Sequence, residues 1–396
     1  MKAKKTVDNV NTDENVYYVA AKKVRFYRFA VLALLVAFVL GGMIVYKDEI
    51  TLENFRYLLK YIDMEGAFDY DGGQTISLDT QGKRRVDIFK GDIVVASNSE
   101  VKIFDYWGNK VLSDSVVMSN PMLVVGDKYM LVYDVGGKKL RIYNSFSLLY
   151  DITTEYPIYA ADINDNGYFC YVTNDKGYHS SVNVYNSNFE QIYKWSSSDK
   201  FVIDVSYKKD SNTLLSLATF KAVGGHYLSE IIVLSTEEKV PVKTFTVEDK
   251  MPLDITFSET EKIFLLADDS YYTFDFENEE TYIYNFNSDC LKMYTSSEKY
   301  GALIINDSIV GVECSVQIIN DKCEQLLSKS FDVQILDLEV KDDKMYVLTL
   351  GKAYIVDIDS GDVFEIETDI EDRNISCISD KHIVFISDSM ARICET

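Results

Sequence analysis

Short apolar stretches separated by polar turns fill the sequence from about residue 66 to its end. The repeating unit is four short strands, with a polar turn between the third and the fourth. Eight such units begin 36 to 51 positions apart, close to the period of a four-stranded propeller blade, near Arg85, Pro121, Pro157, Phe201, Pro252, Leu291, Val333 and Ile375. The pattern therefore predicts an all-β fold, a β-propeller in residues 66–396.

Prolines and turn residues support this division into units. Pro121, Pro157 and Pro252 stand where first strands begin, and a missing N–H is tolerated at that position. The stretch 353–356 runs into the turn residues Asp357-Ile358-Asp359-Ser360-Gly361, and similar turns follow 101–104, 140–143 and 182–185.

The two ends of the repeat predict how the ring closes. The last unit reaches Thr396 after only three strands, while residues 74–78 form a single strand before the first complete unit. Pairing this strand with the last unit would complete a blade and protect its exposed edge. We expect eight blades, with seven as the alternative.

A long apolar run near the N-terminus predicts a membrane anchor. The eighteen residues from Phe29 to Tyr46 carry no charge, and this length can span a bilayer. The run ends Met43-Ile44-Val45-Tyr46, without the small residues of a cleavage site, so we favour an uncleaved transmembrane helix over a signal peptide or a buried core helix. Four basic residues precede it, at positions 22, 23, 25 and 28, and basic flanks usually stay in the cytoplasm. We expect a basic cytoplasmic tail (1–28), one helix through the lipid bilayer (29–46) and an extracytoplasmic remainder on the cell membrane.

A stalk is expected between the anchor and the repeat. Leu52, Phe55, Leu58, Leu59 and Ile62 recur at spacings of three and four, the pattern of one helical face. Residues 47–65 are therefore predicted to form a short helix.

Composition and charge narrow the choice of partners. Hydrophobic residues make up 47% of the chain, enough for a sizeable core, and its 29 tyrosines and 21 phenylalanines favour strands. The net charge is −23, but residues 1–28 carry +4, so the remainder carries −27. Such a surface repels phosphate backbones, which excludes nucleic acid and favours basic proteins, cationic envelope polymers or divalent cations. None of the six cysteines forms a CxxC pair, so neither a zinc site nor a thioredoxin-like motif is predicted.

Two resemblances to known families fit this layout. The segment 354–364, Tyr-Ile-Val-Asp-Ile-Asp-Ser-Gly-Asp-Val-Phe, resembles the repeat of propellers related to quinone-dependent dehydrogenases, with Phe364 where those repeats have Trp. The whole layout of basic tail, single helix and tyrosine-rich propeller is similar to an uncharacterised bacterial family with a domain of unknown function. That resemblance implies the fold but carries no functional residues.

Four aspartates form the first candidate site. An aliphatic-Asp-aliphatic triplet recurs in predicted first strands and contains Asp87, Asp204, Asp254 and Asp337. First strands line the central channel of a propeller, where converging carboxylates could bind a ligand or a cation such as Ca²⁺. We favour a simpler interpretation, in which one polar residue per strand faces a solvated channel and no cofactor is bound.

A second calcium-like pattern is weaker. Residues 162–167 match D-x-N-x-N-G, the first half of a calcium-binding loop. The twelfth position is Thr173 instead of the expected Glu, so an ordinary turn is the favoured interpretation.

Two long loops form a candidate partner-binding rim. Tyr178, His179, His226 and Tyr227 lie in the connections between second and third strands of adjacent units. Long loops on a rigid scaffold often carry recognition residues, although a plain surface loop is the competing interpretation.

These patterns favour a non-enzymatic function. No G-x-S-x-G, H-E-x-x-H or phosphate-binding glycine-rich motif follows the anchor. We expect an extracytoplasmic interaction or scaffold module that binds a protein or an envelope polymer. The alternative is a propeller that binds or transforms a carbohydrate, or uses a quinone or Ca²⁺, in the acidic channel.

Overall fold

The computed structural model describes residues 23–36, 74–78, 82–105, 107–258, 260–287, 291–297, 299–306, 313–379 and 381–395. The chain divides into two compact units, residues 1–69 and 70–396. In the first unit, residues 23–36 form an exposed helix. None of the helices within the described ranges has the length and apolar character needed to cross a membrane. The predicted tail up to residue 22, the rest of the predicted anchor (37–46) and the predicted stalk (47–65) lie outside the described residues.

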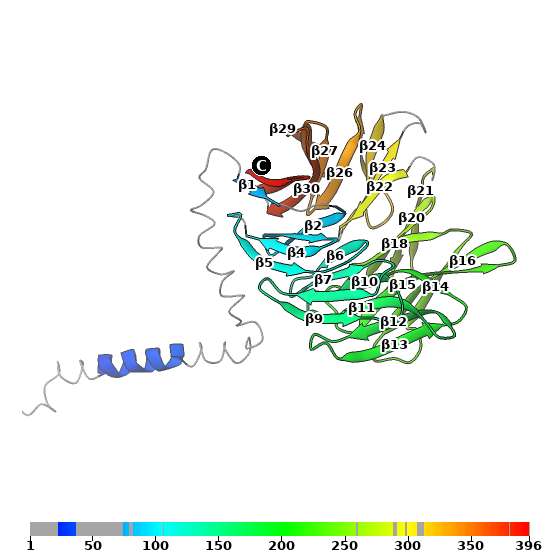
Figure 1. Cartoon of the computed structure of the whole chain (residues 1–396), viewed down its shortest axis with the longest axis horizontal. Coiled ribbons are helices and arrows are strands. Elements are labelled where there is room, and N and C mark those ends of the chain that lie inside the picture. Colours follow the sequence, from blue (N-terminus) through cyan, green and yellow to red (C-terminus); the bar gives the residue numbers. More distant parts are fainter. Residues whose placement is uncertain are drawn as a thin grey trace, which may run out of the picture. The chain divides into compact units, whose positions relative to one another are not determined.

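The second unit is an eight-bladed β-propeller. Its strands form eight antiparallel sheets of four strands each, and Figure 1 shows the sheets following one another in chain order. Eight blades are thus confirmed over seven, and each first strand begins within three residues of its predicted start.

The first four blades contain the following strands. Blade 1 consists of β2 (Arg84–Phe89), β3 (Asp92–Ser97), β4 (Glu100–Phe104) and β5 (Lys110–Ser115). Blade 2 consists of β6 (Pro121–Val125), β7 (Met130–Asp134), β8 (Lys139–Tyr143) and β9 (Leu148–Thr153). Blade 3 consists of β10 (Ile158–Ile163), β11 (Phe169–Asp175), β12 (Tyr178–Tyr185) and β13 (Gln191–Ser197). Blade 4 consists of β14 (Phe201–Tyr207), β15 (Leu214–Val223), β16 (His226–Ser235) and β17 (Lys243–Glu248).

The remaining blades repeat the arrangement. Blade 5 consists of β18 (Pro252–Phe257), β19 (Lys262–Ala267), β20 (Ser270–Asp275) and β21 (Thr281–Asn285). Blade 6 consists of β22 (Leu291–Ser296), β23 (Gly301–Asn306), β24 (Cys314–Ile319) and β25 (Gln325–Phe331). Blade 7 consists of β26 (Ile335–Lys341), β27 (Lys344–Thr349), β28 (Lys352–Asp357) and β29 (Val363–Glu367). Blade 8 consists of β30 (Asp372–Ser379), β31 (His382–Ser387), β32 (Met390–Glu395) and β1 (Gln74–Ser77).

The ring closes in blade 8, as the sequence predicts. The N-terminal strand β1 pairs antiparallel with β32 and becomes the fourth strand of the last blade. The side chains of Ile76 and Leu78 are buried there, and the Leu78 N–H donates to the Ser389 carbonyl oxygen over 2.9 Å. First strands of neighbouring blades contact one another, including β30 and β2, so these strands are innermost.

The core lies between the blades. Phe89 and Val94 of blade 1, for example, pack with Met130 and Tyr143 of blade 2. Inner strands such as β3 and β31 are buried along their whole length because a blade covers each of their faces, whereas outer strands such as β21 alternate between exposed and half-buried. Four cysteines are buried in these clusters as small core residues, namely Cys170, Cys314, Cys323 and Cys377. Cys290 lies outside the described residues.

Successive strands of each blade run in opposite directions, so the connections between strands fall on two distinct faces of the propeller. We call face 1 the side that bears the turns between second and third strands and the links between blades. Face 2 bears the turns between first and second and between third and fourth strands. On face 1, β15 and β16 form a hairpin with ten residues in each strand, which reaches beyond its neighbours in Figure 1. Its turn uses Gly224 and Gly225 at φ of 60° and 90°, a conformation that glycine adopts without strain.

Candidate functional site

The innermost strands share an irregularity that aims their polar side chains. In six blades the pairing of the first strand shifts by one residue near its start. Such a bulge turns the following side chains to a new direction. Three of the predicted aspartates, Asp204, Asp254 and Asp337, are the first paired residues after the shift. The pairing of β2, which carries Asp87, has no shift.

Two of these aspartates connect neighbouring blades. The Ile255 N–H of blade 5 donates to Oδ2 of Asp204 in blade 4 over 3.1 Å. The Ile375 N–H of blade 8 donates to Oδ2 of Asp337 in blade 7 over 2.9 Å, and the side-chain amide of Asn374 adds a bond of 3.1 Å. Since no sheet spans two blades, these carboxylates supply acceptors that sheet pairing would otherwise provide.

Two residues further along the first strands, other carboxylates accept backbone N–H groups of the next blade in the same way. The Tyr207 N–H donates to Oδ2 of Asp162 in the preceding blade over 2.7 Å, and the Cys377 N–H donates to Oε2 of Glu339 over 3.0 Å. Asp162 opens the calcium-like segment, but its carboxylate also accepts the N–H of Ile163 and is thus occupied by backbone donors. Sequence reasoning missed Glu339 because it lies outside the triplet.

The channel carboxylates form two groups, and within each group the charge of one carboxylate raises the pKa of another. Burial raises the pKa of Asp204 to about 8, with a contribution from the charge of Asp254. Burial raises the pKa of Asp254 to about 6, with a contribution from Asp162. In the other group, burial raises the pKa of Glu339 to about 7, and the charge of Asp87 adds to the shift.

Two lysines partly balance the acidic channel. The pKa of Asp87 is raised by burial, while the charges of Lys209 and Lys341 act in the opposite direction. The Lys341 ammonium donates to the Cys377 carbonyl oxygen over 2.9 Å. Within the described part of the chain, no three His, Cys, Asp or Glu side chains lie close enough to hold a metal ion. Four of the carboxylates, those of Asp162, Asp204, Asp337 and Glu339, accept backbone N–H groups of the next blade.

The predicted rim residues lie on face 1, but in strands and not in long loops. Tyr178 and His179 begin β12, and His226 and Tyr227 begin β16. Only the two-residue turns 176–177 and 224–225 connect these strands to the preceding ones, because the strands extend further than the sequence predicts. All four rim residues are exposed.

His179 stacks on Phe201 with ring centroids 4.4 Å apart, Phe201 stacks on Phe220 at 5.3 Å, and Phe220 meets Tyr227 edge to face at 6.1 Å. We call the set His179, Phe201, Phe220 and Tyr227 the aromatic row.

The remaining rim residues, Tyr178 and His226, lie beside the aromatic row but have different contacts. Tyr178 is 47% exposed, and the Nδ1 of His226 lies 3.0 Å from a carboxylate oxygen of Asp249. Sequence reasoning missed Phe201 and Phe220, which look like ordinary apolar strand residues. Their pairing in one register across β14 and β15 could have signalled the row.

Exposed apolar side chains gather on face 1. It carries Val117, Tyr159, Tyr178, Phe201, Val223, Tyr227, Leu253, Val333, Leu350, Ile370 and Met390, whereas face 2 carries Trp107, Phe146, Val240 and Val242. Other exposed apolar residues of the described propeller lie on outer strands. Scattered apolar residues are ordinary on a surface, but a concentration on one face indicates an interaction site.

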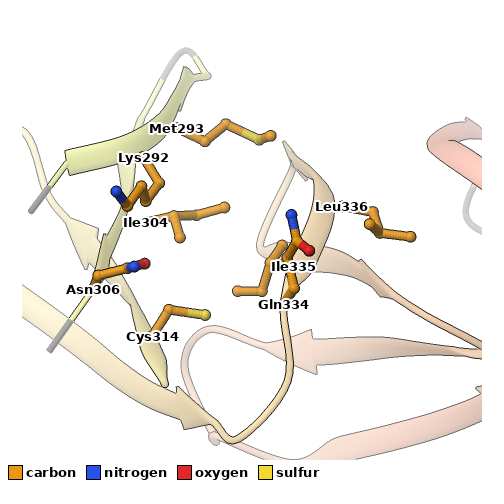
Figure 2. A pocket seen from close by; sticks show the side chains of 8 residues that line it. All are labelled: Lys292, Met293, Ile304, Asn306, Cys314, Gln334, Ile335 and Leu336. Carbon is orange, nitrogen blue, oxygen red and sulfur yellow. The ribbon is translucent and has the colours of Figure 1, made fainter. Parts of the chain in front are cut away.

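Face 1 also contains a cavity of about 390 Å³ between blades 6 and 7. Figure 2 shows side chains of β22 and β23 on one side and those before and within β26 on the other. The lining combines one ammonium group and two amides with apolar side chains and a thiol, contributed by Lys292, Met293, Ile304, Asn306, Cys314, Gln334, Ile335 and Leu336.

Comparison with known proteins agrees with this architecture. A family model described as a family of unknown function, DUF5711, matches residues 68–394, which is almost the whole propeller. The chain belongs to this family. No curated protein matches this DUF5711 sequence.

Several solved structures share the fold of this DUF5711 member. BamB from Moraxella catarrhalis is 14% identical with a TM-score of 0.54, and the match covers 82% of this chain and 99% of BamB. Sqt1 from Saccharomyces cerevisiae is 9% identical with a TM-score of 0.57, over 82% and 99% of the two chains. AztD from Citrobacter koseri is 12% identical with a TM-score of 0.52, over 73% and 87%. At these identities the similarity shows the β-propeller fold alone.

Proposed function

We propose that this DUF5711 protein is a membrane-anchored, non-enzymatic module whose β-propeller lies outside the cytoplasm and binds another protein through face 1. The observation that carries the proposal is the concentration of exposed apolar side chains on that face, including the aromatic row. Buried aromatic anchors supply much of the binding energy in protein interfaces. An envelope polymer is the alternative partner.

The sequence supports the proposed anchor and orientation. The uncharged run from Phe29 to Tyr46 is long enough to span a bilayer, and the preceding basic residues favour a cytoplasmic N-terminus. The strongly acidic composition of the propeller fits a basic partner better than nucleic acid or an anionic lipid surface.

Site-specific photocrosslinking in cells of the source organism tests the proposal on the full chain. A photoreactive amino acid replaces Val223, which is 53% exposed on face 1, or Phe364, which is 57% exposed on an outer strand. We expect one recurrent polypeptide adduct from position 223, in a membrane fraction that resists alkaline washing, and none from position 364. Phe201→Ser with Tyr227→Ser should remove the adduct.

The same experiment can overturn the proposal. Identical adducts from both positions would show that face 1 is not selective, and a polysaccharide adduct alone would identify an envelope polymer as the partner. Release of the full chain from washed membranes would contradict the anchor.

A further inference from the structure

We propose that the aromatic row binds a basic segment of the partner protein, in which cationic side chains accompany apolar ones. This inference rests on the proposed function and specifies the chemistry of the partner. Its basis is the exposed carboxylate of Asp249 at one end of the row, together with the acidic composition of the propeller.

The aromatic row forms a continuous surface across two blades. His179 comes from β12 of blade 3, while Phe201, Phe220 and Tyr227 come from three consecutive strands of blade 4. Phe201 and Tyr227 are 42% and 51% exposed, so their mutual contacts leave much ring surface open to a partner. The hairpin of β15 and β16 extends this surface beyond the neighbouring strands (Figure 1).

An exposed carboxylate lies directly beside the Tyr227 end of the row. The Asp249 N–H donates to the Tyr227 carbonyl oxygen over 3.1 Å, and the Asp249 side chain is 62% exposed. Glu248 pairs with Leu228, so its side chain projects from the opposite face of the sheet to that of Tyr227. Within the described residues, Asp249 has His226 as its ion-pair partner. A lysine or arginine side chain of a partner could therefore meet Asp249 and rest against the Tyr227 ring.

The other charged side chains near the row are paired with one another. Asp199 lies 3.6 Å from the Lys221 ammonium, and Lys200 pairs with Glu230. These internal pairs leave the middle of the row to apolar contacts. The surface thus offers an apolar strip with the Asp249 carboxylate at its Tyr227 end, which matches a segment with both apolar and basic side chains.

Two labelled peptides test this chemistry on the purified full chain by fluorescence anisotropy. One alternates lysine and leucine, and the other alternates glutamate and leucine. We expect the basic peptide to bind at least about tenfold more tightly than the acidic one. Phe201→Ser with Tyr227→Ser should weaken its binding about tenfold, and Asp249→Asn alone should weaken it about threefold.

Matched controls separate this site from general attraction to an acidic protein. Glu238→Gln removes the same charge from face 2 of the same blade and should change the affinity less than about 1.5-fold. Phe364→Ser removes an exposed aromatic ring elsewhere and should also have little effect. Weakening by Glu238→Gln equal to that by Asp249→Asn, or equal binding of the acidic peptide, overturns the inference.

The outcomes also distinguish this inference from the proposed function. If the row substitutions abolish binding of the acidic peptide, the partner class is wrong but protein binding through face 1 stands. If neither peptide binds and position 223 gives no adduct in cells, both proposals fail. The melting temperature of each variant confirms that the propeller remains folded.

Discussion

At the scale of single residues, the channel carboxylates replace sheet pairing at the joints between blades. Asp204 and Asp337 accept backbone N–H groups of the next blade at one level, and Asp162 and Glu339 do so at the next. A buried N–H without an acceptor costs about 1–3 kcal/mol, so these contacts fix the angle between blades as well as stabilising them. For Asp204 and Asp337, the aliphatic-Asp-aliphatic triplet is therefore explained by a contact between blades, whereas Asp87 accepts the N–H of its own neighbour Ile88.

Asp204→Asn should stabilise the protein at alkaline pH. The amide oxygen can still accept the Ile255 N–H, but the buried negative charge is lost. Because burial raises the pKa of Asp204 to about 8, the folded state binds more protons than the unfolded state above the ordinary aspartate pKa. Wild-type stability therefore falls as the pH rises toward that value. The advantage of the variant should grow with pH and reach about 1–2 kcal/mol near pH 9.

Thermal unfolding of both proteins between about pH 5 and about pH 9 measures this effect. A Thr219→Val variant is the control, because the buried Thr219 hydroxyl donates to the Glu230 carbonyl oxygen without carrying a charge. It should destabilise the protein by a similar amount at every pH. A difference between Asp204→Asn and wild type that does not change with pH would contradict the assignment.

At the scale of elements, the short strand β1 closes the propeller ring. Its four residues complete the blade that joins the end of the chain to its beginning. Ile76 is 2% exposed and faces Gly108, where an added Cβ would lie 3.3 Å from the Ile76 side chain. Gly108 also has a φ of 82°, so both its backbone and its neighbour favour glycine.

Ile76→Asp should open the ring. The substitution places a carboxylate in the apolar space between β1 and its neighbours, and we expect a loss of about 2–4 kcal/mol in the free energy of unfolding by urea. Thr75→Asp is the matched control, because Thr75 is exposed on the other side of the same strand. It should change stability by less than about 0.5 kcal/mol. Equal effects of the two substitutions would show that β1 does not hold the ring closed.

At the scale of the whole molecule, the sequence predicts the number of blades and the closure of the ring better than the orientation and exposure of individual side chains. Proline positions, turn residues and the unpaired strand 74–78 predict eight blades and their closure because these signals are local. The strand shifts that orient Asp204 and Asp254 are not visible locally, since they depend on pairing with the second strand. The exposure of Phe201 and Phe220 likewise depends on where neighbouring blades end.

The sequence indicates only half of the aromatic row. His179 and Tyr227 stand in segments that the sequence presents as long connections, and the structure brings both into the row, although as strand residues. Phe201 and Phe220 also lie in strands, and only the strand register places them opposite each other. The ends of strands are therefore harder to identify as surface from the sequence than the blades themselves.

Ring closure also predicts how the propeller opens. In an open array each blade contacts only its neighbours, so stability varies from the ends to the middle and the ends open first. In this closed ring every blade has two neighbours, because β30 contacts β2 and β1 completes blade 8.

Amide protons of buried strands such as β3, β7, β20 and β31 should therefore exchange with one common free energy of opening, measured by hydrogen exchange and mass spectrometry. With Ile76→Asp, exchange should become graded, fastest in blades 8 and 1, whereas Thr75→Asp should keep the uniform pattern. Graded exchange in the wild-type protein would mean that the blades open one by one and that closure contributes little to their cooperativity.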